Sequence, residues 1–252
     1  MTVQNGILKR AILTALIYIG IMAVGMYVTG HIAGITYGDP KMVRVLFYFE
    51  VVMSLLALFM ARRIFGRVQC GFSPADLSGL WWMAPNFLIL AALFYMALSA
   101  GGAAMSGLVL LIIATMCLVG FSEELMFRGI VLKGALAEMS QGRAIILSSV
   151  FFALLHSVNI LARLPIENML AQLVLTFVFG LAMACFALRI NSLIPVIVFH
   201  TLWDLVQFLG GVFGADFGPL INIAIIVNAV MGAALYVFVL KKKQTGETSA
   251  AV

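Results

Sequence analysis

Residues 103–129 read AAMSGLVLLIIATMCLVGFSEELMFRG. The stretch is uncharged from Ala103 to Ser122 and then continues into two carboxylates, Glu123 and Glu124, with Arg128 four residues after the second. About 20 consecutive apolar residues are enough to cross the hydrocarbon layer of a bilayer as a helix. The segment therefore predicts a transmembrane helix that carries ionisable side chains at its end.

The composition of the whole chain agrees with this segment. Of 252 residues, 64% are apolar and only 10% are Asp, Glu, Lys or Arg, and the mean hydropathy is +1.15. Soluble domains carry roughly 25% charged residues, because these cover the surface. The composition excludes a soluble enzyme, a disordered regulator and a disulfide-stapled secreted module.

Further stretches of the same character lie on both sides of this segment. They are Ala11–Thr29, Val45–Ala61, Trp81–Ser99, Ala144–Leu161, Met169–Leu188, Ser192–Leu209 and Pro219–Leu240. We predict an all-α polytopic membrane protein, a bundle of about eight transmembrane helices. No linker or repeat divides the chain, so residues 1–252 are expected to form a single domain, with the motif-bearing core at about 103–209 and a disordered tail at 244–252.

The basic residues gather at one set of span ends. An even number of spans puts both termini on the same side of the membrane, and most lysines and arginines fall on that side. They are Lys9, Arg10, Arg62, Arg63, Arg67, Lys133, Arg143, Arg189 and Lys241–Lys243. Cytoplasmic connections carry such an excess, so both termini are expected to be cytoplasmic. We therefore expect the basic residues behind the net charge of +5 to contact the headgroups of the lipid bilayer, and we expect no nucleic acid partner.

Ionisable residues inside apolar spans are costly and mark function by default. The chain has three histidines and ten acidic residues, and several of them fall in three apolar segments. These are Glu123, Glu124, His156, His200 and Asp204.

Helical spacing suggests how the residues of each group relate. Glu124 and Arg128 lie four apart and can form an ion pair on one face, which leaves Glu123 facing elsewhere. His200 and Asp204 share a face by the same spacing. Each group also has a purely structural interpretation: the Glu pair marks a helix end, His156 is a core histidine bonded to a backbone carbonyl, and His200 with Asp204 forms a self-satisfied buried pair.

The helix lengths allow the three groups to meet. If the helix carrying Glu124 runs to Met139 and the chain returns through His156, both residues lie about 21–22 Å from the same turn, at a rise of 1.5 Å per residue. His200 is about 14 Å from Asn191 by the same rise. One cavity, open toward the side of the termini, is expected to hold all of them.

The ordered set Glu-Glu-x-x-x-Arg, Phe-x-x-x-His and His-x-x-x-Asp, each in its own span, resembles the CAAX-processing and bacteriocin-processing (Abi) intramembrane endopeptidase family. The matching region is about Ser122–Gln207, and its most specific part is Glu-Glu-Leu-Met-Phe-Arg-Gly. The resemblance implies an intramembrane endopeptidase, of the metallo- or glutamate type, that acts on a membrane-associated peptide or protein.

The resemblance also implies a role for each matching residue. Glu123 activates the attacking water and His156 shares in that activation, while Glu124 and Arg128 brace the helix. His200 and the residue at 204 bind the developing oxyanion. The usual residue at that last position is Asn, and here it is Asp204, which as a carboxylate would suit orienting His200 or binding a metal. Glu123, His156 and His200 could also hold a zinc ion, since Glu and His are zinc ligands.

Two other classes of function remain open from the sequence. Buried Glu and His residues also form proton relays, so a proton- or metal-coupled transporter is one alternative, although we find no inverted repeat between the halves. A non-catalytic membrane protein acting by binding, as in bacteriocin immunity, is the other. In each case the expected location is the cell membrane, as a multi-pass protein of the bacterial inner membrane.

Overall fold

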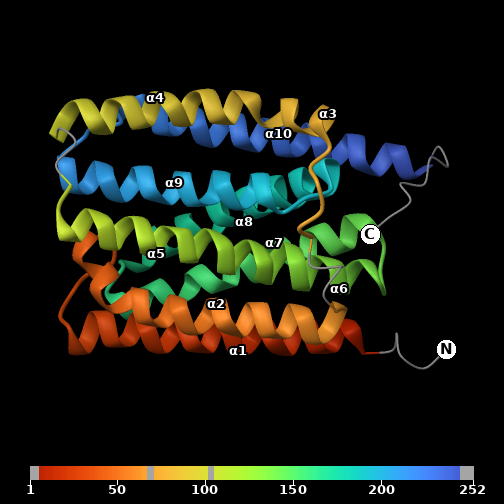
Figure 1. Cartoon of the computed structure of the whole chain (residues 1–252), viewed down its shortest axis with the longest axis horizontal. Helices are drawn as coiled ribbons and strands as arrows, with labels where there is room; N and C mark the ends of the chain where they lie inside the picture. Colours follow the sequence, from red (N-terminus) through yellow and green to blue (C-terminus); the bar gives the residue numbers. More distant parts are fainter. Residues whose placement is uncertain (1–5, 67–70, 102–104, 245–252) are drawn as a thin grey trace.

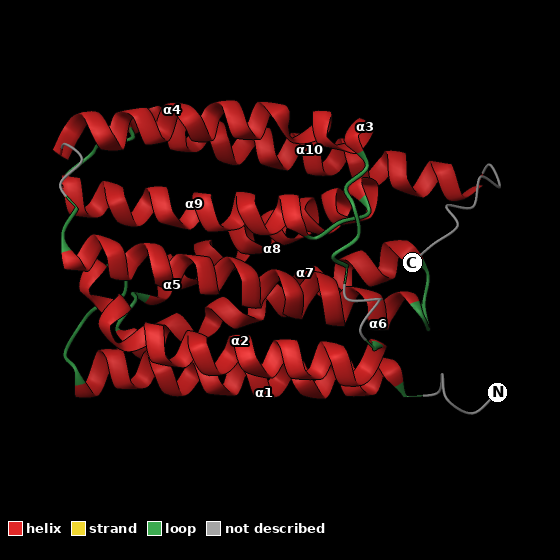
Figure 2. Cartoon of the chain, in the orientation of Figure 1, coloured by secondary structure: helices red, strands yellow, loops and turns green. Residues whose placement is uncertain are grey.

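The computed structural model describes residues 6–66, 71–101 and 105–244, with side chains described up to residue 240. In this part of the chain every regular element is a helix (Figure 2). The α-helices are α1 (Ile7–Tyr27), α2 (Val43–Phe65), α3 (Leu77–Leu80), α4 (Ala84–Gly101), α5 (Gly107–Glu124), α6 (Lys133–Leu136), α7 (Gln141–His156), α8 (Ile166–Ile190), α9 (Ile194–Phe213) and α10 (Gly218–Gln244). Short π- and 3-10 helices extend several of them.

Within the described residues, eight helical segments are long and apolar enough to cross a membrane. They run over Ile7–Ile32, Pro40–Phe65, Leu77–Gly101, Gly107–Leu136, Gln141–Ala162, Ile166–Ile190, Ile194–Phe213 and Gly218–Leu240. The predicted all-α, polytopic architecture is confirmed, and each predicted span corresponds to one of these segments. Arg67, Cys70 and the predicted tail beyond Gln244 lie outside the described residues, as do the side chains of Lys241–Lys243, while α10 itself continues to Gln244.

Neighbouring spans pack against one another throughout the bundle. Helix α7 packs against α8, and α8 against α10; α5 packs against α9 and α2; α2 also packs against α1, and α4 against α9 and α10. Helices α5, α7 and α9, which carry the motifs, lie in the middle of the bundle together with α8 (Figure 1). Helix α1 begins and α10 ends at the same end of the bundle, called here the terminal end; the connection between α1 and α2 lies at the other, called here the loop end (Figure 1).

Two glycines let the motif helices approach closely. A Cβ on Gly120 of α5 would lie only 2.8 Å from the backbone nitrogen of Thr201 in α9, and one on Gly180 of α8 would lie 3.2 Å from Cα of Ser149 in α7. Gly120 precedes Glu123 by three residues, and Thr201 follows His200 directly. The absence of a side chain at Gly120 thus brings the acidic motif against the histidine of α9.

The acidic motif ends α5 and begins a π-helical segment, Leu125–Leu132, in which every residue is buried. π-Helical turns inside longer helices occur frequently at functional sites. Here the segment continues the span directly after Glu124, so that the Glu-Glu pair lies in the interior of the bundle and not at its surface.

Candidate active site

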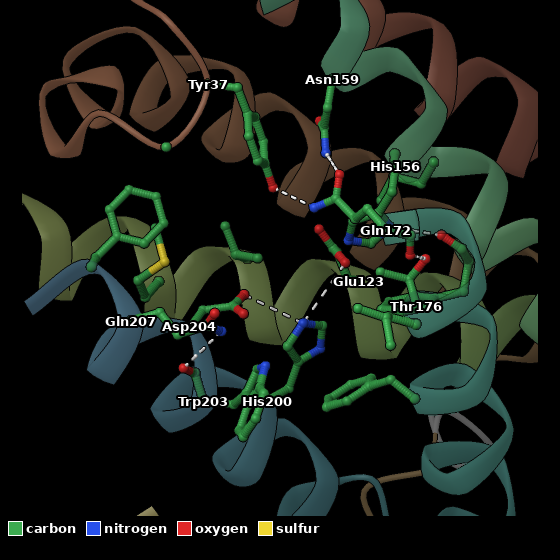
Figure 3. A pocket seen from close by; sticks show the side chains of 18 of the residues that line it. Tyr37, Glu123, His156, Asn159, Gln172, Thr176, His200, Trp203, Asp204 and Gln207 are labelled. Carbon is green, nitrogen blue, oxygen red and sulfur yellow. Dashed lines mark hydrogen bonds and ion pairs between the residues drawn. The ribbon is translucent and has the colours of Figure 1, made fainter. Parts of the chain in front are cut away.

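A cavity of about 460 Å³ lies between the helices that carry the three motifs. Its walls come from α1, α2, α5, α7, α8, α9 and α10, together with the loop before α2. Figure 3 shows that Glu123, His200 and Asp204 point toward one another across it. All four residues predicted to be catalytic line this cavity: Glu123, His156, His200 and Asp204.

Glu124 lies behind the cavity wall and joins two of the motifs. Its Oε1 accepts hydrogen bonds from Nη1 of Arg128 at 2.8 Å and from Nδ1 of His200 at 2.7 Å. The predicted pair of Glu124 with Arg128 is therefore present, with both side chains fully buried. The bond from His200 to Glu124 was not predicted, because the spacing of residues within one helix does not show which side chain of another helix Glu124 contacts.

Arg128 contacts three of the helices around it, although its Nε has no hydrogen-bond partner among the described residues. Besides Glu124, it donates from Nη2 to the carbonyl oxygen of Gly180 at 3.2 Å, and its guanidinium carbon lies 4.3 Å from the centre of the Phe152 ring. A buried arginine with a carboxylate, a carbonyl and an aromatic face around it serves as a brace between α5, α7 and α8. Its charge is directed away from the cavity, which it does not line.

Glu123 has the opposite environment. The side chain is 5% exposed, lines the cavity, and its Oε2 has no hydrogen-bond partner among the described residues. The nearest ionisable group is His200, whose Nε2 is 3.9 Å from that oxygen. Because a buried carboxylate without a donor is costly, Glu123 has an oxygen available for water or substrate.

His200 has a different carboxylate near each ring nitrogen. With Nδ1–H donated to Glu124, the nitrogen that faces the cavity is Nε2, which lies 3.4 Å from Oδ2 of Asp204 and 3.9 Å from Glu123. The rings of Phe152 and Phe179 flank the imidazole, with centroids 5.7 and 5.2 Å away. The bond to Glu124 thus fixes the orientation of the ring and leaves Nε2 to exchange a proton in the cavity.

His156 is the last residue of α7, and its Nε2 is the ring nitrogen left free of the backbone. Its Nδ1 lies 2.9 Å from the carbonyl oxygen of Phe152, and because a carbonyl only accepts, Nδ1 carries the proton. Nε2 is then an acceptor. The backbone bond foreseen in the structural interpretation of His156 is real, but the residue lines the cavity as well.

A chain of neutral polar groups forms the wall opposite Asp204 (Figure 3). Asn159 donates to Gln172 at 2.8 Å, and Gln172 donates to the hydroxyl oxygen of Tyr37 at 2.7 Å. Burial raises the pKa of Tyr37 to about 12, and the carboxylates of Asp204 and Glu123 add to the effect. The phenol is therefore neutral, and its proton can be donated into the cavity. Tyr37 lies in the loop before α2 and was not predicted, because no motif or helical spacing points to a residue in a loop.

Glu50 is a further acidic residue at the cavity that was not among the predicted site residues. It is completely buried in α2, lines the cavity, and accepts a hydrogen bond from Ser122 at 2.9 Å, while Ser122 in turn bonds Tyr18 at 2.7 Å. A lone carboxylate inside an apolar span was the signal that singled out the other acidic residues. Applied to α2, the same criterion would have found it.

The residues foreseen as metal ligands do not form a ready ligand set. No group of three or more His, Cys, Asp and Glu side chains that could hold a metal ion is found in the described part of the chain. We therefore derive no step through zinc, which stays a prediction. Elemental analysis of the purified protein, with cleavage measured in the presence and absence of a chelator, tests it.

The cavity lies nearer the loop end than expected. Its lining residues in α1, α2 and α10 all fall in the halves of these helices near the α1–α2 connection, and Tyr37 and Gly38 of that connection line it too. The sequence predicted a cavity open toward the termini, and these lining residues favour access from the loop end instead.

Comparison with known proteins bears on the motif-bearing segment of the chain. Residues 105–206 match the family model described as type II CAAX prenyl endopeptidase Rce1-like. No curated protein and no solved structure matches the chain. The matched segment contains Glu123, Glu124, Arg128, His156, His200 and Asp204. The matched segment is thus similar to the Rce1-like CAAX prenyl endopeptidases, and its residues Glu123, His156, His200 and Asp204 line the cavity.

Proposed function

We propose that the chain hydrolyses a peptide bond of a membrane-associated protein or peptide inside this cavity, with water activated by Glu123 and the histidines. The observation that carries the proposal is the buried Glu123 carboxylate, whose Oε2 has no partner among the described residues and lies 3.9 Å from Nε2 of His200. A general base must have a free oxygen beside the reacting atoms, and a second proton carrier must lie within reach.

In the proposed reaction Glu123 takes a proton from water while the water oxygen attacks the carbonyl carbon of the substrate. The new C–O bond converts that carbon to a tetrahedral intermediate with a negative oxygen. When the C–N bond breaks, the proton passes to the leaving amine, and the products are a carboxylate and an amine. Nε2 of His156 is an acceptor placed to hold the water, and Nε2 of His200 carries protons between the carboxylates.

The negative oxygen of the intermediate needs a donor. An ionised Asp204 cannot donate a hydrogen bond, although it lies 3.4 Å from Nε2 of His200. The Tyr37 hydroxyl is a neutral donor that lines the same cavity. We propose that Nε2–H of His200 and the hydroxyl of Tyr37 donate hydrogen bonds to this oxygen. Asp204 then orients the imidazole of His200 from the cavity side.

Asp204→Asn tests this assignment. The amide keeps the shape of the side chain and can donate, but it removes the negative charge beside His200. If Asp204 acts as a carboxylate on His200, turnover should fall by about 10-fold or more, since charge-assisted hydrogen bonds are worth about twice neutral ones. Gln207→Glu, one turn further along the cavity-facing side of α9, is the matched charge control. Turnover that holds or rises in Asp204→Asn would instead give position 204 the role of oxyanion donor.

The proposed hydrolysis is tested on the purified chain in lipid vesicles with membrane-anchored reporter peptides. In water enriched in oxygen-18, the new carboxylate should carry one labelled oxygen, detected by mass spectrometry. The transporter alternative predicts no cleavage but movement of protons or metal ions across the vesicle membrane, and the binding alternative predicts neither. Intact peptides in this assay, across a set varied in sequence, would contradict the proposal.

We further propose that the protein is a multi-pass protein of the cell membrane with its termini in the cytoplasm, and that the cavity opens to the opposite face. The lysines and arginines at the terminal end support the orientation, and the lining residues Tyr37 and Gly38 support the side of access. Substrates would then be peptides or proteins exposed on the non-cytoplasmic side, or membrane segments entering from it.

Cysteine accessibility tests this topology. In a variant with the native cysteines replaced, Thr36→Cys, exposed in the α1–α2 connection, should react with a membrane-impermeant maleimide in intact cells. Ser140→Cys, exposed before α7 at the terminal end, should react only after permeabilisation. The reverse pattern would place the cavity on the cytoplasmic side.

A further inference from the structure

The wall contributed by α2 and by the 3-10 turn before it (Pro40–Met42) combines an apolar stripe with a buried acid. Met42, Leu46 and Glu50 follow one another at intervals of four residues and all line the cavity. At 1.5 Å per residue the stripe runs about 12 Å from the loop end to the carboxylate. Met22 and Met26 of α1 lie along the same cavity. Glu50 therefore lies deep on an apolar, methionine-rich surface.

Glu50 has a free oxygen at that depth. Its Oε2 accepts from Ser122 at 2.9 Å, while its Oε1 has no hydrogen-bond partner in the described part of the structure. The side chain is fully buried. A buried carboxylate oxygen without a donor is a costly arrangement, and it would be relieved by a ligand that brings a donor.

The charges around the cavity show which kind of donor fits. Glu50, Glu123 and Asp204 line it from α2, α5 and α9, and no lysine or arginine is among its described lining residues. The nearby Arg128 is engaged by Glu124 and Gly180. His156 and His200 line it too, but a protonated His200 balances only one of the three carboxylates. An excess of one sign of charge in a low-dielectric surrounding concentrates ligands of the opposite sign.

We propose that Glu50 forms the base of a cation-binding subsite that accepts a primary ammonium or guanidinium group of the substrate, with the alkyl stem along Met42 and Leu46. Lysine and arginine side chains combine an apolar stem with a charged head in this way. Glu50 lies outside the family match at residues 105–206, so the subsite is a property of the remainder of this chain. As a statement about substrate it rests on the proposed function, but its binding test does not.

The binding test uses pentylamine as the probe and pentan-1-ol as its neutral counterpart, with thermal unfolding of the purified protein as the measurement. Pentylamine should raise the unfolding midpoint of the wild type and pentanol should not. Glu50→Gln keeps an acceptor for Ser122 but loses the charge, so its affinity for pentylamine should fall by about 10-fold or more. Glu138→Gln, an exposed acid at the terminal end, should respond like the wild type.

A second variant keeps the test decisive if Glu50→Gln does not fold. Leu46→Lys places an ammonium four residues before Glu50, on the same face of α2, where it can reach the carboxylate. This protein should fold and no longer respond to pentylamine, whereas Leu46→Met should fold and respond. An unfolded Leu46→Lys protein, an unchanged response in Glu50→Gln, or equal effects of amine and alcohol on the wild type would each overturn the subsite.

Cleavage of paired peptides separates the subsite from the proposed function. Two peptides that differ only in lysine or norleucine at one position should differ by about 10-fold or more in KM, and Glu50→Gln should remove the difference. An amine response through Glu50 without any cleavage would retain the subsite and reject the protease. Cleavage with neither an amine response nor a preference for lysine would retain the protease and reject the subsite.

Discussion

Replacing Glu123 with glutamine should lower the rate of peptide hydrolysis by roughly 10²–10⁴-fold, the usual contribution of general acid–base catalysis. Glutamine has nearly the same shape but cannot take a proton from water. The fold should tolerate the change, because Oε2 of Glu123 has no hydrogen-bond partner among the described residues and its nearest charged neighbour is 3.9 Å away. Turnover of a reporter peptide and the thermal unfolding midpoint, measured on the same preparation, check both parts.

Glu124→Gln is the matched comparison, since the two acids are adjacent in sequence and differ only in their surroundings. Glutamine at 124 would face Arg128 and His200 without a charge, and so stability should fall together with activity. For Glu123→Gln only activity should fall. A Glu123→Gln protein that cleaves at the wild-type rate would end the assignment of Glu123 as the base.

Arg128→Ala should destabilise the protein by about 3–5 kcal/mol, the cost of removing one partner of a buried ion pair. The side chain is fully buried and contacts Glu124 at 2.8 Å, the carbonyl of Gly180 at 3.2 Å and the face of Phe152. Its loss leaves Glu124 with His200 alone and opens a gap between α5, α7 and α8. Denaturant or thermal unfolding in detergent measures the change.

Arg189→Ala is the control for that prediction. Arg189 also forms an ion pair, with Asp76 at 2.7 Å, but 45% of the Asp76 side chain is exposed. Hydrogen bonds from Ser78 and Arg189 hold the pKa of Asp76 at about 2, so the pair is ionised at neutral pH, yet water screens it. A much smaller change in the midpoint is expected. Equal effects of the two substitutions would contradict the role of Arg128 as an internal brace.

The exchange of Glu124 and Arg128 gives a sharper comparison. If the two residues acted only on each other, Glu124→Arg combined with Arg128→Glu would restore the pair. Because Glu124 also accepts Nδ1–H of His200 at 2.7 Å, an arginine at 124 would present a positive charge to that nitrogen. We expect the exchanged protein to be no more stable than Arg128→Ala, and recovery would show that the bond to His200 contributes little.

The spans and the motif residues could be predicted from sequence because lipid imposes strong local rules. A helix must be long and apolar to cross the hydrocarbon, and a charge within it stands out against its neighbours. The same rules gave the pair of Glu124 and Arg128, which depends only on the pitch of one helix. Glu50 is also a charged residue in an apolar span, but it was not predicted as a site residue because it has no motif around it.

Contacts between helices were outside the reach of such rules. The bond from His200 to Glu124 depends on the close approach of α5 and α9 at Gly120 and Thr201, and Tyr37 reaches the cavity from a loop. The side on which the cavity opens also depends on how far each helix extends past the site. Sequence by itself determined a helical membrane protein and the residues of its motifs, since hydrophobicity and helical spacing are local. Tertiary structure alone decided which carboxylate is paired and which is free, because that depends on the atoms that neighbouring helices bring to each one.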